Sequence, residues 1–159
     1  MKSPTMNIDK LIVDCIKSGT SYAEKGKSVS IKKEHDELVL VFQTDNAVVR
    51  SVLGIARSCD VTFVYMRHRR RPILIFCELK GRNVDDAAEQ VQSTLTAVRR
   101  AVKNIIAADF PQNGDIRALI VRTGSAPHNQ GAIQDKFQRE TGVRLQFARE
   151  RADLRSYLG

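Results

Sequence analysis

The chain has 159 residues, of which 42% are hydrophobic and 28% are charged, and its formal net charge is +8. This size and balance are typical of one compact globular domain and exclude a disordered or fibrous chain. No apolar run approaches the roughly 18–20 residues that span a bilayer, so we expect no membrane segment. The first residues contain no long apolar segment, so we expect no signal peptide. The cysteines form no C-x-x-C pair, which is typical of free thiols in a reducing compartment. We therefore expect a single cytoplasmic domain over residues 1–159.

Hydrophobic periodicity and turn residues predict helices and strands in an alternating order. The predicted elements are a helix over 6–16, a loop over 18–28, a hairpin of 29–31 with 38–42, a short helix capped by Thr44 or Asp45 and ending at Leu53, strands over 61–66 and 73–77, a helix from Asn83 or Asp85 to Ile105, a strand over 115–121, a helix from Ser125 to Gly142, a strand over 143–147 and a short helix over 151–158. The strand over 73–77 is apolar on both faces, which indicates an interior position in a sheet. This order predicts an α/β domain.

Two carboxylates are predicted to meet across the hairpin that joins the strands over 61–66 and 73–77. If its turn centres on Arg69, Val61 lies opposite Cys77, and Asp60 lies opposite Glu78. Opposed residues on antiparallel strands hold their Cβ atoms about 4.5–5.5 Å apart. Two carboxylates at that separation repel each other unless a cation lies between them, and oxygen ligands suit Mg²⁺ or Mn²⁺.

Lys80 extends this candidate site. Side chains two residues apart on a strand share a face, so Glu78 and Lys80 are expected on one face, with the Leu79 carbonyl as a further metal ligand. Lys80 would deprotonate an attacking water or stabilise charge on a phosphate. Taken singly, Asp60 could instead cap a loop, and Glu78 with Lys80 could be an exposed ion pair worth less than about 1 kcal/mol. Their combination at one strand end favours an active site.

An Asp, a hairpin, Glu-x-Lys at a strand end and a following helix with Gln together resemble the PD-(D/E)xK nuclease superfamily. That superfamily includes type II restriction enzymes and archaeal Holliday junction resolvases. The matching segments are Cys59-Asp60, Phe76-Cys77-Glu78-Leu79-Lys80-Gly81 and Ala88-Glu89-Gln90.

This resemblance implies a restriction-endonuclease-like core, in which a central mixed β-sheet is flanked by helices. It implies catalytic roles for Asp60, Glu78 and Lys80. It also implies a role for Gln90, because a helical Gln contacts the site in exonuclease-like members. The family's glutamate on the first helix has no clear match, and Asp14 and Glu24 are the candidates.

A basic turn forms the tip of the same hairpin. Adjacent positive charges repel one another without an anion nearby, so we expect this turn to contact backbone phosphates. The expected contacts are made by Arg67, Arg69, Arg70 and Arg71. The turn begins about seven residues from Asp60 and from Glu78, or roughly 23 Å along the strands at about 3.3 Å per residue. The alternative is an ordinary solvated turn.

We therefore predict a Mg²⁺-dependent phosphodiesterase that acts on nucleic acid, with DNA favoured over RNA and internal over terminal cutting. Three alternatives remain open. A nucleic-acid-binding module would keep the fold and cut little, whereas a relative of Holliday junction resolvases would act as a homodimer on branched DNA. A nuclease toxin or defence component would depend on a protein partner for specificity.

Overall fold

The computed structural model describes residues 15–80, 83–105 and 110–159, and all of their side chains except those of Lys80 and Ile105. The predicted helix over 6–16 therefore lies almost wholly outside the described residues, as does Asp14. Its last predicted residue, Ile16, belongs to a strand. None of the described helices has the length and apolar character needed to cross a bilayer.

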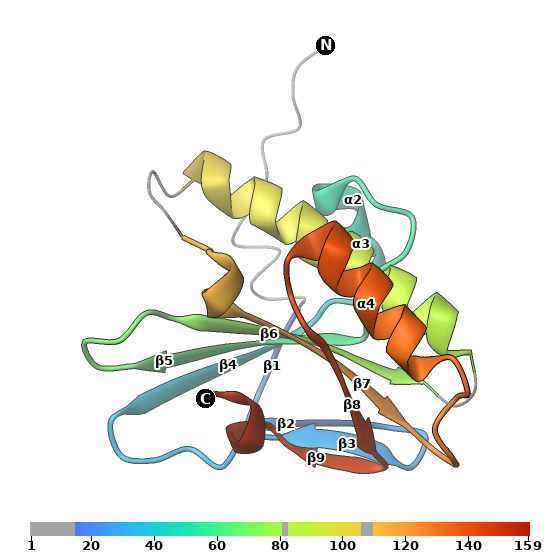
Figure 1. The fold of residues 1–159 in the computed structure, drawn as a ribbon. Coiled ribbons are helices and arrows are strands. Elements are labelled where there is room, and N and C mark those ends of the chain that lie inside the picture. The colour runs from blue at the N-terminus through green and yellow to red at the C-terminus, as the bar shows by residue number, and fades with distance from the viewer. Residues whose placement is uncertain (1–14, 81–82, 106–109) are drawn as a thin grey trace.

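A six-stranded sheet with the order β1-β4-β5-β6-β7-β8 forms the centre of the domain (Figure 1). Its strands are β1 (Ile16–Lys17), β4 (Glu37–Gln43), β5 (Val61–Arg67), β6 (Ile73–Lys80), β7 (Ile116–Arg122) and β8 (Leu145–Arg149). The neighbours from β1 to β6 pair antiparallel, and β6, β7 and β8 pair parallel. The prediction of an α/β domain is confirmed, its central sheet is mixed, and β6 has the predicted interior position.

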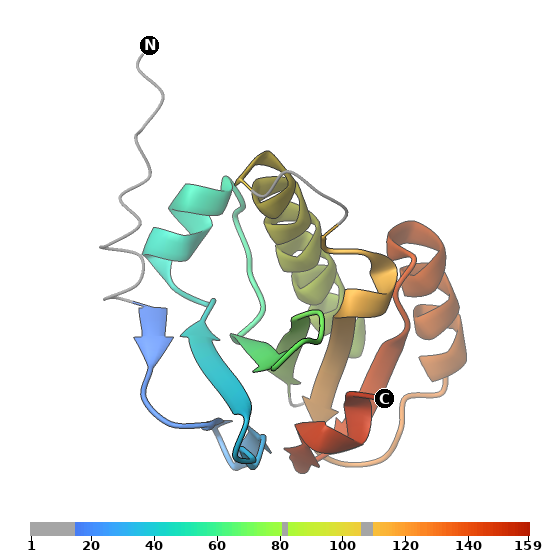
Figure 2. The same ribbon diagram turned by 90° about the vertical axis from the view of Figure 1, so that its left-hand side faces the viewer.

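Helices cover one face of this sheet and a second, smaller sheet covers the other (Figure 1 and Figure 2). The described helices are α2 (Ala47–Leu53), α3 (Val84–Ile105) and α4 (Gln130–Thr141). The smaller sheet has the order β2-β3-β9 and contains β2 (Ser21–Glu24), β3 (Lys27–Ser30) and β9 (Arg151–Asp153). Within the described residues, the helices that flank the central sheet therefore lie on one of its faces, and the smaller sheet lies on the other.

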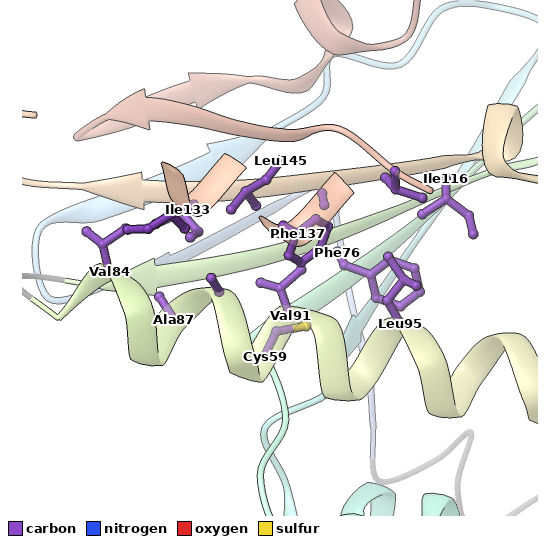
Figure 3. Packing of buried hydrophobic residues seen from close by; sticks show 14 of the residues in the cluster. Cys59, Phe76, Val84, Ala87, Val91, Leu95, Ile116, Ile133, Phe137 and Leu145 are labelled. Atoms are coloured by element: carbon purple, nitrogen blue, oxygen red, sulfur yellow. The ribbon is translucent and has the colours of Figure 1, made fainter. Parts of the chain in front are cut away.

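Two apolar clusters separate these layers because side chains alternate along each strand. In β6, Leu74 and Phe76 pack against α3 and α4, whereas Ile75 and Cys77 pack toward the smaller sheet. Figure 3 shows the helix-side cluster, in which Phe76 and Val91 lie between the sheet and α3. Glu78 continues the helix-side row of β6 beyond Phe76, at the edge of this apolar layer.

The smaller sheet corrects the prediction for the N-terminal third. The predicted loop over 18–28 contains β2 and β3, joined at Lys25 and Gly26 with φ angles of 48° and 77°. Positive φ at both central residues is typical of a two-residue type I′ hairpin turn. The predicted hairpin of 29–31 with 38–42 is wrong, since β3 pairs with β2 and β9. The alternation of Val29 and Ile31 reflects their burial under the central sheet, and burial alone does not identify a pairing partner.

Element boundaries differ mainly where capping decides them. The side chain of Asn46, rather than that of Thr44 or Asp45, caps α2 by accepting from two backbone N–H groups. The helix α4 begins at Gln130 rather than Ser125 and ends, as predicted, at Gly142, whose φ is 73°. The predicted terminal helix is wrong over its first residues, because 151–153 form β9 before a 3₁₀ turn over Leu154–Tyr157.

Glu37 joins the C-terminal segment to the central sheet. Its Oε1 accepts from Tyr65 Oη at 2.5 Å and from Arg155 Nη2 at 2.8 Å. Its Oε2 accepts from Arg155 Nη1 at 2.8 Å and from the Glu34 N–H at 2.9 Å. The hydrogen bonds from Arg155, with those from Tyr65 and Glu34, hold the pKa of Glu37 well below its usual range.

A lowered pKa in the folded state means that ionised Glu37 stabilises the fold above the usual glutamate pKa of about 4.3. This contribution is lost progressively as the pH falls below that value. We expect Glu37→Gln to lower the free energy of unfolding at pH 7 and to lower it less at pH 3, as measured by urea denaturation. Asp36→Asn is the control, because its ion pair with Arg67 is exposed and 3.6 Å long. An equal loss at both pH values would contradict this role for the Glu37 charge.

Candidate active site

Asp60 is fixed at the start of β5 by hydrogen bonds from three directions. Its carbonyl accepts from the N–H groups of Thr44 at 3.0 Å and Asp45 at 3.2 Å. Its own N–H donates to Glu78 Oε2 at 3.0 Å, and its Oδ2 accepts from the Leu79 N–H at 2.6 Å. The residue is 7% exposed, so its carboxylate is held in a largely dehydrated place.

Glu78 lies beside Asp60 because the hairpin has the predicted register. Val61 pairs with Cys77, and Tyr65 pairs with Ile73. Beyond Val61 and Cys77, the Glu78 carboxylate accepts the Asp60 N–H and the Asp60 carboxylate accepts the Leu79 N–H. Glu78 is only 2% exposed. The two carboxylates therefore lie buried side by side at the end of the β5–β6 hairpin.

Gln90 of α3 covers the Glu78 carboxylate. Its amide orientation is assigned from the surrounding network. In that orientation its nitrogen donates to Glu78 Oε1 at 2.5 Å, and its oxygen accepts from Arg57 Nη2 at 2.9 Å. The structure thus brings together three of the predicted site residues, Asp60, Glu78 and Gln90.

A hydroxyl group ties α3 to the segment before Asp60. Thr94 Oγ1 donates to the Gln90 carbonyl at 2.9 Å and accepts from the Cys59 N–H at 2.8 Å. Thr94 is fully buried, so this bridge does not compete with water. It sets the position of Gln90 on the helix relative to Asp60 on the strand.

Arg57 is a site residue that the sequence analysis missed. Besides its contact with Gln90, its Nη2 lies 2.6 Å from Asp86 Oδ2. The hydrogen bond to Asp86 raises the pKa of Arg57, and the negative charges of Asp86, Glu89 and Glu78 add to this effect. Nothing in the sequence separates Arg57 from any other loop arginine, because its role depends on the position of α3.

The β2–β3 hairpin lies on the face of the central sheet opposite the helices. Burial raises the pKa of Tyr22 to about 12, with further increases from the negative charges of Glu24, Asp60 and Asp45. The Tyr22 hydroxyl donates to Glu24 Oε2 at 3.5 Å. Of the two candidates for an additional acidic residue, Glu24 is thus on the hairpin whose Tyr22 responds to the Asp60 charge, whereas Asp14 lies outside the described residues.

The oxygen atoms at this strand end suit a hard divalent cation. Both N–H and C=O of a strand residue point toward the same neighbouring strand. The Leu79 N–H donates to Asp60, so the Leu79 carbonyl also lies on the Asp60 side of β6. Within residues 15–80, 83–105 and 110–159, no three His, Cys, Asp or Glu side chains form a metal-binding group. A cation here would be held by Asp60, Glu78 and the Leu79 carbonyl, with water completing its shell, as Mg²⁺ prefers.

Lys80 is the last residue of β6, and its side chain lies outside the described part of the chain.

The nearby thiols of Cys59 and Cys77 do not provide an alternative nucleophile. Burial raises the pKa of Cys59 to about 12 and that of Cys77 well above its usual value. Both thiols are therefore protonated at neutral pH and poorly suited to act as nucleophiles.

The basic turn lies at the opposite end of the hairpin from the carboxylates (Figure 1). Arg71 is committed to Asp115 through Nε–Oδ1 and Nη2–Oδ2 contacts of 2.9 and 2.6 Å. Arg67 has a longer contact with Asp36. The side chains of Arg69 and Arg70 form no hydrogen bond or ion pair with any described residue. Of the four arginines predicted to bind phosphate, these two carry uncompensated charge, and Arg71 has a structural partner.

We expect Asp60→Ala to unfold at lower urea concentration than Asp60→Asn in the absence of divalent ions. Both substitutions remove the charge, but only asparagine keeps an oxygen for the buried Leu79 N–H, whose loss costs about 1–3 kcal/mol. Asp45→Ala is the control, since Asp45 is exposed and its expected change is within about 0.5 kcal/mol. Equal stability of the two Asp60 variants would show that this hydrogen bond does not support the strand end.

A second comparison separates structural from free arginines in the basic turn. Arg71→Ala should lower the free energy of unfolding by about 1–3 kcal/mol, because it leaves the buried Asp115 carboxylate without its guanidinium partner. The double variant Arg69→Ala with Arg70→Ala should unfold like the wild type in the same denaturation experiment. A large loss of stability in the double variant would mean that this turn needs all three arginines for folding.

No protein-family model, curated protein or solved structure matches this chain. A function for it must therefore be inferred from the site itself, in which two buried carboxylates end a pair of strands and a helical glutamine covers one of them.

Proposed function

We propose that this protein is a metal-dependent nuclease of the PD-(D/E)xK type, which hydrolyses phosphodiester bonds of nucleic acid, with DNA favoured over RNA. The observation that carries the proposal is the contact between Asp60 and Glu78 at the end of β5–β6, with Gln90 of α3 on Glu78. Two carboxylates are rarely buried side by side unless a cation or proton relieves their repulsion.

The order of the elements also supports a restriction-endonuclease-like core. The strands β4, β5 and β6 form an antiparallel meander, α3 follows, and β7 returns parallel to β6. This arrangement puts the Glu-x-Lys strand in the interior of the sheet, with its carboxyl end next to the start of the helix that carries Gln90 (Figure 1).

Each residue would have a separate task. Asp60, Glu78 and the Leu79 carbonyl would hold Mg²⁺ or Mn²⁺, a cation that favours deprotonation of water and neutralises phosphate charge when bound. Lys80 would take the proton of the attacking water or stabilise the charge that develops on the phosphate. Gln90 orients the Glu78 carboxylate, and Arg57 orients Gln90. Each carboxylate oxygen has two acceptor directions, so an oxygen that accepts a backbone N–H can also bind a cation.

One observation favours a nucleic-acid-binding module as the second candidate. The buried carboxylates already satisfy two backbone N–H groups, and that structural role requires no catalysis. Such a module would keep the net charge of +8 and bind polyanions without cutting them. A homodimer that resolves branched DNA, or a nuclease directed by a protein partner, would use the same site.

The deciding experiment is a cleavage assay on linear, circular, single-stranded and branched substrates with Mg²⁺, Mn²⁺ or chelator. We expect cutting only with a divalent ion, and calorimetric metal binding that is lost in Glu78→Gln. Lys80→Ala should cut at least about 100-fold more slowly and keep its affinity for nucleic acid, because the lysine acts mainly on the transition state. Lys103→Ala, an exposed substitution near the far end of α3, is the matched control. A wild type that binds nucleic acid but cuts none of these substrates would establish the binding module instead.

A further inference from the structure

A row of basic residues crosses the carboxyl ends of the three parallel strands. In the sheet register, Lys80 of β6 pairs with Arg122 of β7, and Arg122 pairs with Arg149 of β8. The Glu150 N–H donates to the Arg122 carbonyl at 2.8 Å, which ties the residue after β8 to the end of β7. This row lies at the same end of the sheet as Asp60 and Glu78, opposite the basic turn (Figure 1).

Arg122 and Arg149 lie on the face of the sheet that carries Glu78. Glu78 pairs with Ile120, whose side chain belongs to the helix-side cluster, and Phe147 packs against the same cluster. Side chains two residues apart on a strand share a face, so Arg122 follows Ile120 and Arg149 follows Phe147 on that side.

The row is close enough to the carboxylates to contact the same substrate strand. Neighbouring strands lie about 4.8 Å apart and residues advance about 3.3 Å, so Cα of Arg122 is about 8 Å and Cα of Arg149 about 12 Å from Cα of Glu78. At a rise of about 3.4 Å per nucleotide, these distances correspond to roughly two to four nucleotides. The basic turn, at roughly 23 Å along the strands, is about twice as far away.

The charges of Arg122 and Arg149 are poorly compensated by the residues that the structure describes. Arg122 Nη1 donates to the Gly124 carbonyl at 2.6 Å, and its buried Nε has no acceptor among the described residues. The Arg149 side chain is 69% exposed, and its contact with the exposed Glu150 is 3.9 Å long. An exposed pair of that length contributes less than about 1 kcal/mol. Arg57 and Arg71, in contrast, each contact a carboxylate at 2.6 Å.

We propose that Arg122 and Arg149 bind the sugar–phosphate backbone on one side of the scissile bond. The substrate strand would run from the Asp60–Glu78 pair across the carboxyl ends of β6, β7 and β8, the edge at which parallel sheets commonly bind ligands. This inference rests on the proposed nuclease function and adds the path of the substrate. Guanidinium groups that contact phosphates carry no base information, so binding along this row is independent of sequence.

The test measures fluorescence anisotropy of labelled duplex and single-stranded DNA in chelator, so that nothing is cut. Each lost phosphate contact lowers the slope of log affinity against log salt by about 0.9 for duplex and 0.7 for single strands. We expect Arg149→Gln to lower the slope by the amount for one lost contact. The double variant Arg122→Gln with Arg149→Gln should lower it by the amount for two lost contacts. Between 50 and 200 mM salt, the wild type would then lose about 7- to 12-fold more affinity than the double variant.

Arg144→Gln is the matched control, because Arg144 is exposed and directly precedes β8, at the other end of the strand that carries Arg149. Its slope should equal that of the wild type. With Mg²⁺ present, Arg149→Gln should raise KM and leave kcat nearly unchanged, since phosphate contacts away from the scissile bond bind the ground and transition states alike.

Arg149→Gln decides the inference even if Arg122→Gln does not fold, because Arg149 is exposed. If Arg149→Gln keeps the wild-type slope while the wild type still cuts DNA, the row is not on the substrate path and the nuclease proposal stands. An equal decrease of the slope in Arg144→Gln would mean that the row acts only as part of the general surface charge. A wild type that neither binds nor cuts nucleic acid would overturn both proposals.

Discussion

The end of the β5–β6 ladder is the constraint on which the rest of the site depends. There the Glu78 carboxylate accepts the N–H group of Asp60, and the Asp60 carboxylate accepts the N–H group of Leu79. Buried N–H groups need acceptors, and buried carboxylates need donors, so each satisfies the other. The strand end and the candidate metal site are therefore one structure, and the carboxylates are positioned before any ligand arrives.

Other layers of the domain hold this strand end in place. Thr94 links the segment before Asp60 to α3, and α3 in turn places Gln90 over Glu78. The smaller sheet approaches from the opposite face and places Tyr22 within the electrostatic field of Asp60. Two ionised carboxylates this close repel each other, and a cation bound by both would reduce that repulsion. The proposed metal-binding function would give both carboxylates a role.

The positive charges of the chain are divided between internal partners and free surfaces. Arg57, Arg71 and Arg155 are held by carboxylates and contribute to the architecture. Arg149 near the site and the two arginines at the turn tip project into solvent with little or no compensation. The positions of the poorly compensated arginines therefore indicate more about binding than the net charge of +8 does. The proposed substrate path uses the unpaired charges nearest to the carboxylates.

The sequence by itself determined the β5–β6 register, the long helix after it and the pairing of Asp60 with Glu78. These features follow from short-range rules, because hairpin register depends on its turn and the helical stripe depends on a period of 3.6 residues. The tertiary structure alone decided the smaller sheet, the helices on a single face and the role of Arg57. Val29 and Ile31 would alternate in the same way against any buried partner, and Arg57 acquires its role only where α3 packs beside it. Contacts between residues far apart in the chain depend on how whole layers pack, and no local pattern of residues encodes that arrangement.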